Sequence, residues 1–451
     1  MPVNLKRSPV YTAGDRVFCE DGTAYTVLGF LGRGGQGEVY RVRGAEGERA
    51  LKWYHAEEYL AKINGGAFHE NLRRNVEAGV PRLSSGDRAS QFVWPQKMAR
   101  PARGSFGYIM ELFDPRFESM THVLLGRKKR RDGTEQPIAW KSWFLRVTAA
   151  LNIVRAFEIL HAVGYSYQDI NEGGVAIDMQ TGEVLICDCD NVSPDGTNLG
   201  ILGVMRYMAP EVVLRKKLPD RDTDRYSLAV LLFMLFFNSH PMHGTESIAL
   251  HADESIGQQE ADWRIYGSAP HYCLSQANPV NPPHERLHRD VRRLCGLYPR
   301  VLLEAFDTVF TEGVQNPQAR LSSVQWRKVL LQARDCLVQT DGRESFFYTP
   351  QERPLPKEAR LLVYPHGRQV LCMPGKILYR CHLEAFGADY ATPVGKIVAS
   401  PKPGVLALYN ASGGELQVAY QGKTRVCRHG EYMPLIPGST ITVNHLEIGV
   451  R

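Results

Sequence analysis

The chain of 451 residues lacks most of the features that mark secreted, disulfide-linked or membrane-embedded proteins. Its nine cysteines are scattered, odd in number and without a C-x-x-C pair, which disfavours a disulfide framework and favours reduced thiols. Residues 1–10 carry charge but no apolar core, so they do not predict a secretory signal. The longest apolar run, residues 228–237, is too short for a bilayer and predicts a buried helix. We therefore expect a soluble cytoplasmic protein with no membrane partner.

A large excess of charge is also missing. The net charge of +6 and the pI near 8.7 are mild for this length, which admits an anionic ligand such as a nucleotide but does not indicate nucleic-acid binding. The 43% hydrophobic and 23% charged residues predict folded cores, and the length predicts more than one domain.

A glycine-rich turn lies near the start of the chain, between two predicted strands at residues 25–30 and 38–42. Its glycines are Gly32, Gly34, Gly35 and Gly37. Glycine lets the backbone approach a phosphate closely, with N–H groups aimed at the phosphate oxygens. Because the turn joins two strands and not a strand and a helix, it disfavours a dinucleotide-binding fold. Val39 and Lys52, on the strands that follow, make the pattern much more specific.

Two carboxylates follow short predicted segments farther along. Residues 140–162 predict a long amphipathic helix, and Asp169 lies in the polar turn after it. Two strand-like runs, residues 175–178 and 183–187, then lead to Asp188. Asp169 is free to accept a proton and Asp188 to hold a cation, although turn residues and helix caps give the same pattern more often.

Together these motifs resemble the protein kinase superfamily over residues 25–338. The resemblance implies an α+β fold with an N-lobe over about residues 25–112 and a C-lobe over about 113–338, after a lead-in at residues 1–24 with room for one strand. Lys52 would pair with the α- and β-phosphates of ATP. Residues 107–114 would lead into the hinge between the lobes, whose backbone would bind adenine. The implied nucleotide-binding residues are Gly32, Gly34, Gly35, Gly37, Val39, Lys52, Glu70, Met110, Glu111 and Phe113.

The expected partner of Lys52 is a glutamate on a helix predicted over residues 67–78. Glu70 fits by spacing, and Glu77 is the alternative. The implied catalytic residues are Asp169, as the group that accepts or orients the substrate's proton, and Lys52.

The catalytic loop departs from the family pattern. It reads Tyr-Gln-Asp at residues 167–169 where most kinases have His-Arg-Asp, and Gly174 stands at the position of the metal-binding asparagine. The implied metal ligands are Asp188, with Asp190 as a fallback, and Asn171 as a partial replacement for the missing asparagine. The resemblance implies ATP with Mg²⁺, or Mn²⁺ in its place.

The later motifs support the same family. Residues 203–211 resemble the activation segment that ends in Ala-Pro-Glu, with Val204 in place of its threonine. Asp224 would brace the catalytic loop, and Arg320 would pair with Glu211. Among bacterial relatives, the likeness is to kinases that act beside a von Willebrand-type protein and a metal-dependent phosphatase. The region after the kinase domain has no cysteine where those relatives often carry a zinc ribbon, so we expect no zinc.

Residues 339–357 contain prolines and predict a linker. Beyond it, residues 358–451 show short alternating runs broken by glycine and proline, which predict a small all-β sandwich. This part faintly resembles a forkhead-associated domain, without that family's phosphothreonine-binding serine and histidine.

Three functions remain open from the sequence. The first is an ATP-dependent Ser/Thr protein kinase acting on protein substrates, with a cognate phosphatase as a further partner. The alternative is a pseudokinase that binds nucleotide or regulates partner proteins without efficient phosphotransfer, which Gln168, Gly174 and Val204 favour. A third, phosphotransfer to something other than protein, is weaker.

Overall fold

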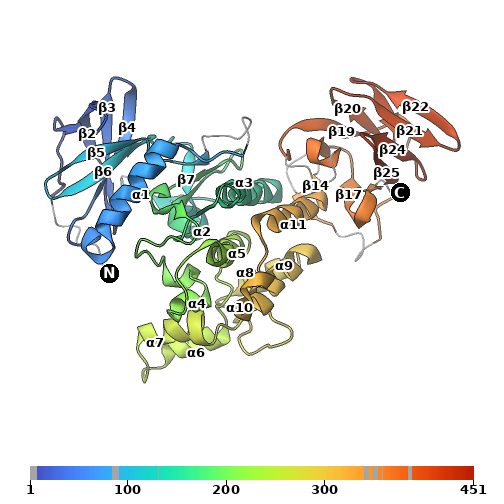
Figure 1. Cartoon of the computed structure of the whole chain (residues 1–451). Coiled ribbons are helices and arrows are strands. Elements are labelled where there is room, and N and C mark those ends of the chain that lie inside the picture. Colours follow the sequence, from blue (N-terminus) through green and yellow to red (C-terminus); the bar gives the residue numbers. More distant parts are fainter. Residues whose placement is uncertain are drawn as a thin grey trace.

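Three parts follow one another along the chain: an N-terminal sheet with one long helix, a mainly helical body, and a C-terminal unit built of strands (Figure 1). The structure is a computed structural model that describes residues 8–83, 91–130, 132–339, 345–348, 354–357, 359–383 and 389–451. Among these residues, no helix is both long and apolar enough to cross a membrane.

The N-terminal part, or N-lobe, is a six-stranded antiparallel sheet with the order β1-β2-β3-β4-β6-β5. Its strands are β1 (Arg16–Phe18), β2 (Ala24–Arg33), β3 (Gly37–Gly44), β4 (Gly47–Tyr54), β5 (Lys97–Ala102) and β6 (Ser105–Met110). Strand β1 lies in the lead-in at residues 1–24, where one strand was expected. The two strands predicted on either side of the glycine turn, β2 and β3, are confirmed. Helix α1 (Gly65–Ala78) packs on the sheet through Phe68 and Leu72, since these two side chains are fully buried against β4 and β6.

The helical body, or C-lobe, is organised around α3 (Trp143–Ala162) and α5 (Arg221–Phe237), whose apolar side chains form the centre of its core. The apolar run predicted to be a buried helix is the second half of α5. The other helices are α2 (Met120–Leu125), α4 (Pro210–Val213), α6 (Thr245–Ala252), α7 (Gln258–Trp263), α8 (Arg289–Cys295), α9 (Arg300–Phe310), α10 (Glu312–Gln315) and α11 (Ser323–Asp335). The short strands are β7 (Phe117–Ser119), β8 (Arg127–Lys129), β9 (Glu135–Pro137), β10 (Tyr165–Ser166), β11 (Val175–Asp178), β12 (Val184–Ile186), β13 (Ser193–Pro194), β14 (Leu337–Gln339) and β15 (Ser345–Phe347).

The C-terminal unit contains two sheets that share one apolar core. One has the order β17-β16-β25-β24-β21-β22 and the other β18-β19-β20-β23. Its strands are β16 (Arg360–Val363), β17 (Gln369–Cys372), β18 (Ile377–Tyr379), β19 (Pro393–Ala399), β20 (Leu406–Asn410), β21 (Leu416–Tyr420), β22 (Lys423–Cys427), β23 (Tyr432–Pro434), β24 (Thr440–Val443) and β25 (Leu446–Val450). The likeness to a forkhead-associated domain stays a prediction. Most of the predicted linker, residues 339–357, lies outside the described residues, as does most of the cysteine-free region behind the zinc prediction.

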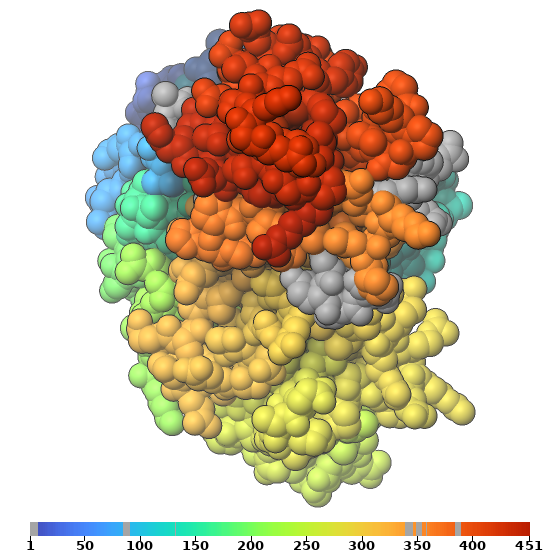
Figure 2. Space-filling model, turned by 90° about the vertical axis from the view of Figure 1, so that its right-hand side faces the viewer, coloured from blue at the N-terminus to red at the C-terminus, as the bar shows by residue number. Residues whose placement is uncertain are grey.

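The C-terminal unit (the β unit) lies on the C-lobe at the end of α11, where α11 contacts β17. In Figure 2 its red and dark-orange atoms lie above the light-orange and yellow part of the chain. The joint is polar and buried. Lys376 donates at 3.0–3.1 Å to the carbonyl oxygens of Arg334 and Asp335, the last two residues of α11, and of Leu337 in β14. The phenol of Tyr390 reaches the carbonyl of Leu151 on α3 at 3.2 Å.

Candidate active site

Lys52 on β4 meets two carboxylates from the turn after β12, so residues 136 positions apart come together between the lobes. Its Nζ lies 3.0 Å from Oδ1 of Asp188 and 2.8 Å from Oδ2 of Asp190. The side chain of Asp188 is 48% exposed, whereas that of Asp190 is fully buried. Burial opposes the charged form of Lys52, but the two carboxylates outweigh it and raise the pKa of Lys52 well above its usual value.

The glycine turn between β2 and β3 lies over this lysine. Gly34 N–H bonds the carbonyl of Gly37 at 2.9 Å, and the side chain of Gln36 accepts from Lys52 Nζ at 2.6 Å. Gly37 has to be glycine because a Cβ there would lie 2.2 Å from the carbonyl oxygen of Trp53. A Cβ on Gly32 or Gly34 would meet nothing within 4 Å, so this stretch of backbone is open for a ligand to approach.

Asp169 sits in a loop that Asp224 braces from below, as the sequence predicted. The carboxylate of Asp224 accepts from the backbone N–H groups of Tyr167 at 2.6 Å and Gln168 at 2.9 Å, and from His161 at 3.2 Å. Burial, with a contribution from the charge of Asp188, raises the pKa of Asp169 to about 7, even though Asn171 donates to its carboxylate at 3.1 Å. A carboxylate with a pKa near neutrality is well matched to proton transfer.

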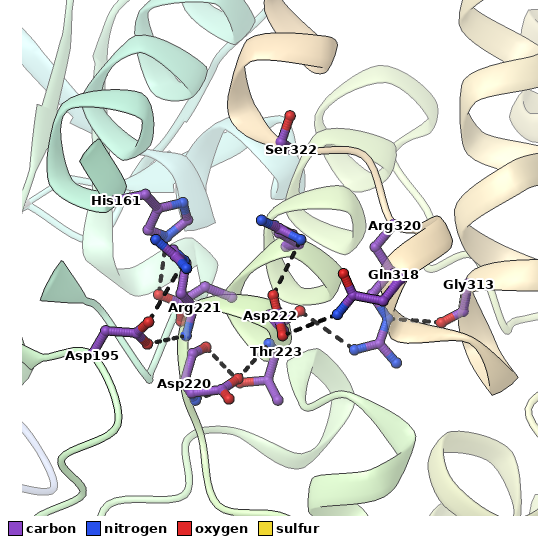
Figure 3. Close-up of polar contacts among 12 residues, drawn as sticks. His161, Asp195, Asp220, Arg221, Asp222, Thr223, Gly313, Gln318, Arg320 and Ser322 are labelled. Carbon is purple, nitrogen blue, oxygen red and sulfur yellow. Dashed lines mark hydrogen bonds and ion pairs between the residues drawn. The ribbon is translucent and has the colours of Figure 1, made fainter. Parts of the chain in front are cut away.

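Further polar contacts fix the N-terminal end of α5 and Arg320 (Figure 3). Asp220 and Thr223 cap the helix reciprocally, and the backbone N–H of Arg221 donates to Asp195 at 2.9 Å. Arg320 makes the predicted pair with Glu211, and the pair is bidentate, at 2.7 and 2.8 Å. Arg320 also donates to the carbonyl of Gly313 at 2.7 Å. These contacts hold the segment after the catalytic loop in place.

Tyr167 fills the space of the expected metal-binding asparagine. Its hydroxyl donates to the carbonyl of Cys187, the residue before Asp188. A Cβ on Gly174 would lie 2.6 Å from that hydroxyl, so the two departures from the family pattern, Tyr167 and Gly174, depend on each other. An asparagine side chain at residue 174 would therefore clash with the Tyr167 hydroxyl.

We expect Gly174→Asn alone to lower the melting temperature by several degrees, because overpacking a buried position costs about 1–3 kcal/mol. The double variant Gly174→Asn/Tyr167→Phe removes the obstructing hydroxyl and should recover most of that loss. Differential scanning fluorimetry of the two variants beside Tyr167→Phe checks this. A single variant as stable as the wild type would contradict the arrangement.

The remaining predicted residues are placed as follows. Glu70 lies on the outer side of α1, with a 55% exposed side chain and its nearest cation, Arg73, at 3.6 Å, so it is not beside Lys52. The side-chain oxygen of Asn171 accepts from the N–H of Gly173 at 2.9 Å, which makes Asn171 a loop-capping residue here.

The other expected nucleotide-binding residues lie on or next to the N-lobe sheet. Val39 pairs with Lys52 across the β3–β4 ladder. Met110 packs partly buried beside α1, Glu111 accepts from Gln96 at 3.2 Å, and Phe113 is 42% exposed.

The sequence interpretation missed the buried role of Asp190 and the roles of Gln36 and Tyr54, whose hydroxyl donates to Asp190. The one available signal was Asp190 itself, an acid where the family motif has glycine.

The N-lobe sheet, the helical C-lobe and this site resemble the arrangement found in protein kinases. Residues 130–283 match the family described as "Protein kinase domain". The chain is 25% identical over 246 residues to Protein kinase YegI of Escherichia coli, covering 52% of this chain and 35% of the relative. It is 30% identical over 152 residues to the Calcium/calmodulin-regulated receptor-like kinase 1 of Arabidopsis thaliana, covering 31% and 33%.

Serine/threonine-protein kinase Sgk1 of Xenopus tropicalis is 28% identical over 106 residues, covering 23% of this chain and 25% of the relative. The chain thus spans 25–35% of the length of these curated relatives. Among solved structures, the kinase domain of Mycobacterium tuberculosis PknI aligns with a TM-score of 0.43 and 17% identity, over 72% of this chain and 99% of that one.

Proposed function

We propose that this protein is an ATP-dependent kinase that transfers the γ-phosphoryl group to serine or threonine hydroxyls of protein substrates. The observation that carries the proposal is the 3.0 Å contact between Lys52 of the N-lobe and Asp188 of the C-lobe. It brings a phosphate-binding cation and a metal-binding carboxylate together under a glycine turn, with Asp169 in the loop below. Partner proteins, including a cognate phosphatase, belong to the same proposal.

The residues present fit the implied cofactors. Asp188 offers a half-exposed carboxylate on a left-handed backbone (φ 49°), and Mg²⁺ commonly takes one or two carboxylates together with phosphate oxygens and water. The open backbone at Gly32 and Gly34 and the ammonium of Lys52 suit the phosphates of ATP. Bound Mg²⁺ would supply neutralisation of the phosphate charge.

The chain's own residues would then divide the work. Lys52 and the glycine turn hold and orient the phosphates, and the backbone at residues 111–113 binds the base. Asp169 accepts the proton of the attacking hydroxyl, and its pKa of about 7 lets it do so near neutral pH. Asp224 and the Glu211–Arg320 pair keep that loop in position.

The same site supports a second candidate function, a pseudokinase that binds nucleotide without efficient transfer. The observation that favours it is the Tyr167 hydroxyl at the place where the family carries its second metal ligand. Both candidates require nucleotide binding, and only the first requires label transfer.

We expect ATP to raise the melting temperature, and Mg²⁺ to increase the rise, because a ligand held at 100 times its Kd adds about 2.7 kcal/mol of stability. A thermal-shift titration with ATP, with and without Mg²⁺, measures this, and Asp188→Asn should remove only the metal-dependent part. Transfer of radiolabel from ATP to this protein or to a generic protein substrate then distinguishes a kinase from a pseudokinase. A protein that neither shifts nor transfers label in any metal would contradict both.

A further inference from the structure

We propose that Asp190 is the residue that positions Lys52 for phosphate binding, in the place where a glutamate on α1 was expected. This inference rests on the proposed function of Lys52. The carboxylate of Asp190 is fully buried, and its Oδ2 accepts both from Lys52 at 2.8 Å and from the hydroxyl of Tyr54 on the same strand. A buried ion pair with a second hydrogen bond holds its cation in one place.

Helix α1 offers no competing carboxylate on its inner face. The buried polar residues there are Asn71 and Asn75, and both side chains donate to the backbone carbonyl of Val192 at 2.8 Å. The helix is therefore fastened by neutral amides to the segment just beyond Asp190, while Glu70 and Glu77 lie on its exposed side. The charge that positions Lys52 comes from the turn that also bears Asp188, not from the helix.

The three contacts of Lys52 differ in how easily a nucleotide could replace them. Gln36 belongs to the glycine turn, and Asp188 is half-exposed, so both stand where phosphates and a cation would arrive. Asp190 lies on the buried side of the ammonium, beneath Tyr54. It keeps its contact when the other two are exchanged, so Lys52 is positioned before nucleotide binds.

Nucleotide binding in the absence of metal tests this role, because a metal ligand would have no effect there. We expect Asp190→Asn to weaken binding of ADP in EDTA about tenfold, the size of one charge-assisted hydrogen bond. In a Lys52→Met background, the same change should weaken binding no further. The matched control is Glu70→Gln, which should bind like the wild type, and Asp190→Glu should recover part of the loss.

The opposite pattern would overturn the inference. If Asp190→Asn binds ADP normally in EDTA and loses affinity only in Mg²⁺, Asp190 acts as a metal ligand. If its effect in EDTA persists in the Lys52→Met background, Asp190 acts independently of Lys52. The double variant Lys52→Met/Asp190→Asn buries no unpaired charge and serves as the folded reference, checked by its melting temperature.

A second measurement needs no nucleotide and so separates this inference from the proposed function. Acylation of lysine amines, followed by mass spectrometry, should modify Lys52 slowly in the wild type, where its side chain is 6% exposed and paired. In Asp190→Asn, we expect modification about tenfold faster, as for loss of one charged partner, with Glu70→Gln like the wild type. Failure of the wild type to bind ADP would contradict the proposed function. Unchanged reactivity of Lys52 in Asp190→Asn would contradict the role of Asp190.

Discussion

Asp335→Ala is expected to lower the free energy of unfolding by about 3–5 kcal/mol, because it removes one member of a buried ionic cluster and leaves the others uncompensated. Asp335 is the last residue of α11. Its carboxylate, with a 1% exposed side chain, accepts from Arg368 Nε at 2.7 Å and from His382 Nε2 at 3.0 Å. Both partners belong to the β unit, so the change also loosens the joint between that unit and the C-lobe.

Urea denaturation followed by circular dichroism measures the loss. The control is Arg380→Ala in the same unit, since the Arg380–Asp389 pair is partly exposed, at 3.5 Å, and surface pairs contribute about 0–1 kcal/mol. Equal effects of the two changes would mean that the buried cluster does not hold the joint.

The same cluster gives the joint a pH dependence. Burial alone would raise the pKa of Asp335, but Arg368 and His382 hold this pKa below its usual value of 3.8. The carboxylate therefore contributes to the stability of the fold above pH 3.8, and this contribution is lost as the pH falls through the lower folded pKa. Burial would lower the pKa of His382, but Asp335 raises this pKa above 6.5. The imidazolium therefore contributes fully to the stability of the fold below pH 6.5, and this contribution is lost as the pH rises through the raised folded pKa. The cluster should therefore contribute most between these limits. The difference in stability between wild type and Asp335→Ala should be largest there.

The sequence predicted Lys52, Asp169 and Asp188 because each sits in a local pattern whose spacing the fold preserves. Glu70 shows where spacing is insufficient. Phe68 and Leu72 set the buried face of α1, and residues three or four positions along a helix share a face, so Asn71 and Asn75 also turn inward. Periodicity within the helix places Glu70 outside, and counting from the family motif did not use that periodicity.

Asp190 could not be assigned from the sequence for a different reason. Asp188 and Asp190 are two positions apart, and a left-handed residue followed by a 3₁₀ turn directs one carboxylate outward and the other into the core.

Several predicted strands of the C-terminal unit are present, whereas its attachment to the C-lobe through Asp335 could not be predicted from the sequence. Its partners lie 33 and 47 residues farther along, and a charged residue at the end of a helix reads as solvated.

Asp169→Asn is expected to reduce phosphotransfer by at least about a hundredfold, the usual contribution of a positioned general base. Asparagine has the same shape and can still accept from Asn171, which donates at 3.1 Å, but it cannot take the proton of the substrate hydroxyl. ADP affinity should stay unchanged, because under the proposed function the phosphates are held by Lys52 and the glycine turn.

Label transfer from ATP in Mg²⁺, measured beside ADP calorimetry on the same preparation, separates these two effects. The matched control is Asp253→Asn, an exposed turn residue that accepts from Ser255, which should transfer label like the wild type. Equal rates for Asp169→Asn and the wild type would mean that the hydroxyl loses its proton to another group or to water. If the wild type binds ADP but transfers no label, the pseudokinase function is favoured. The Tyr167 hydroxyl, 2.6 Å from the place of a Cβ on Gly174, would then supply the physical reason by blocking the expected metal-binding side chain.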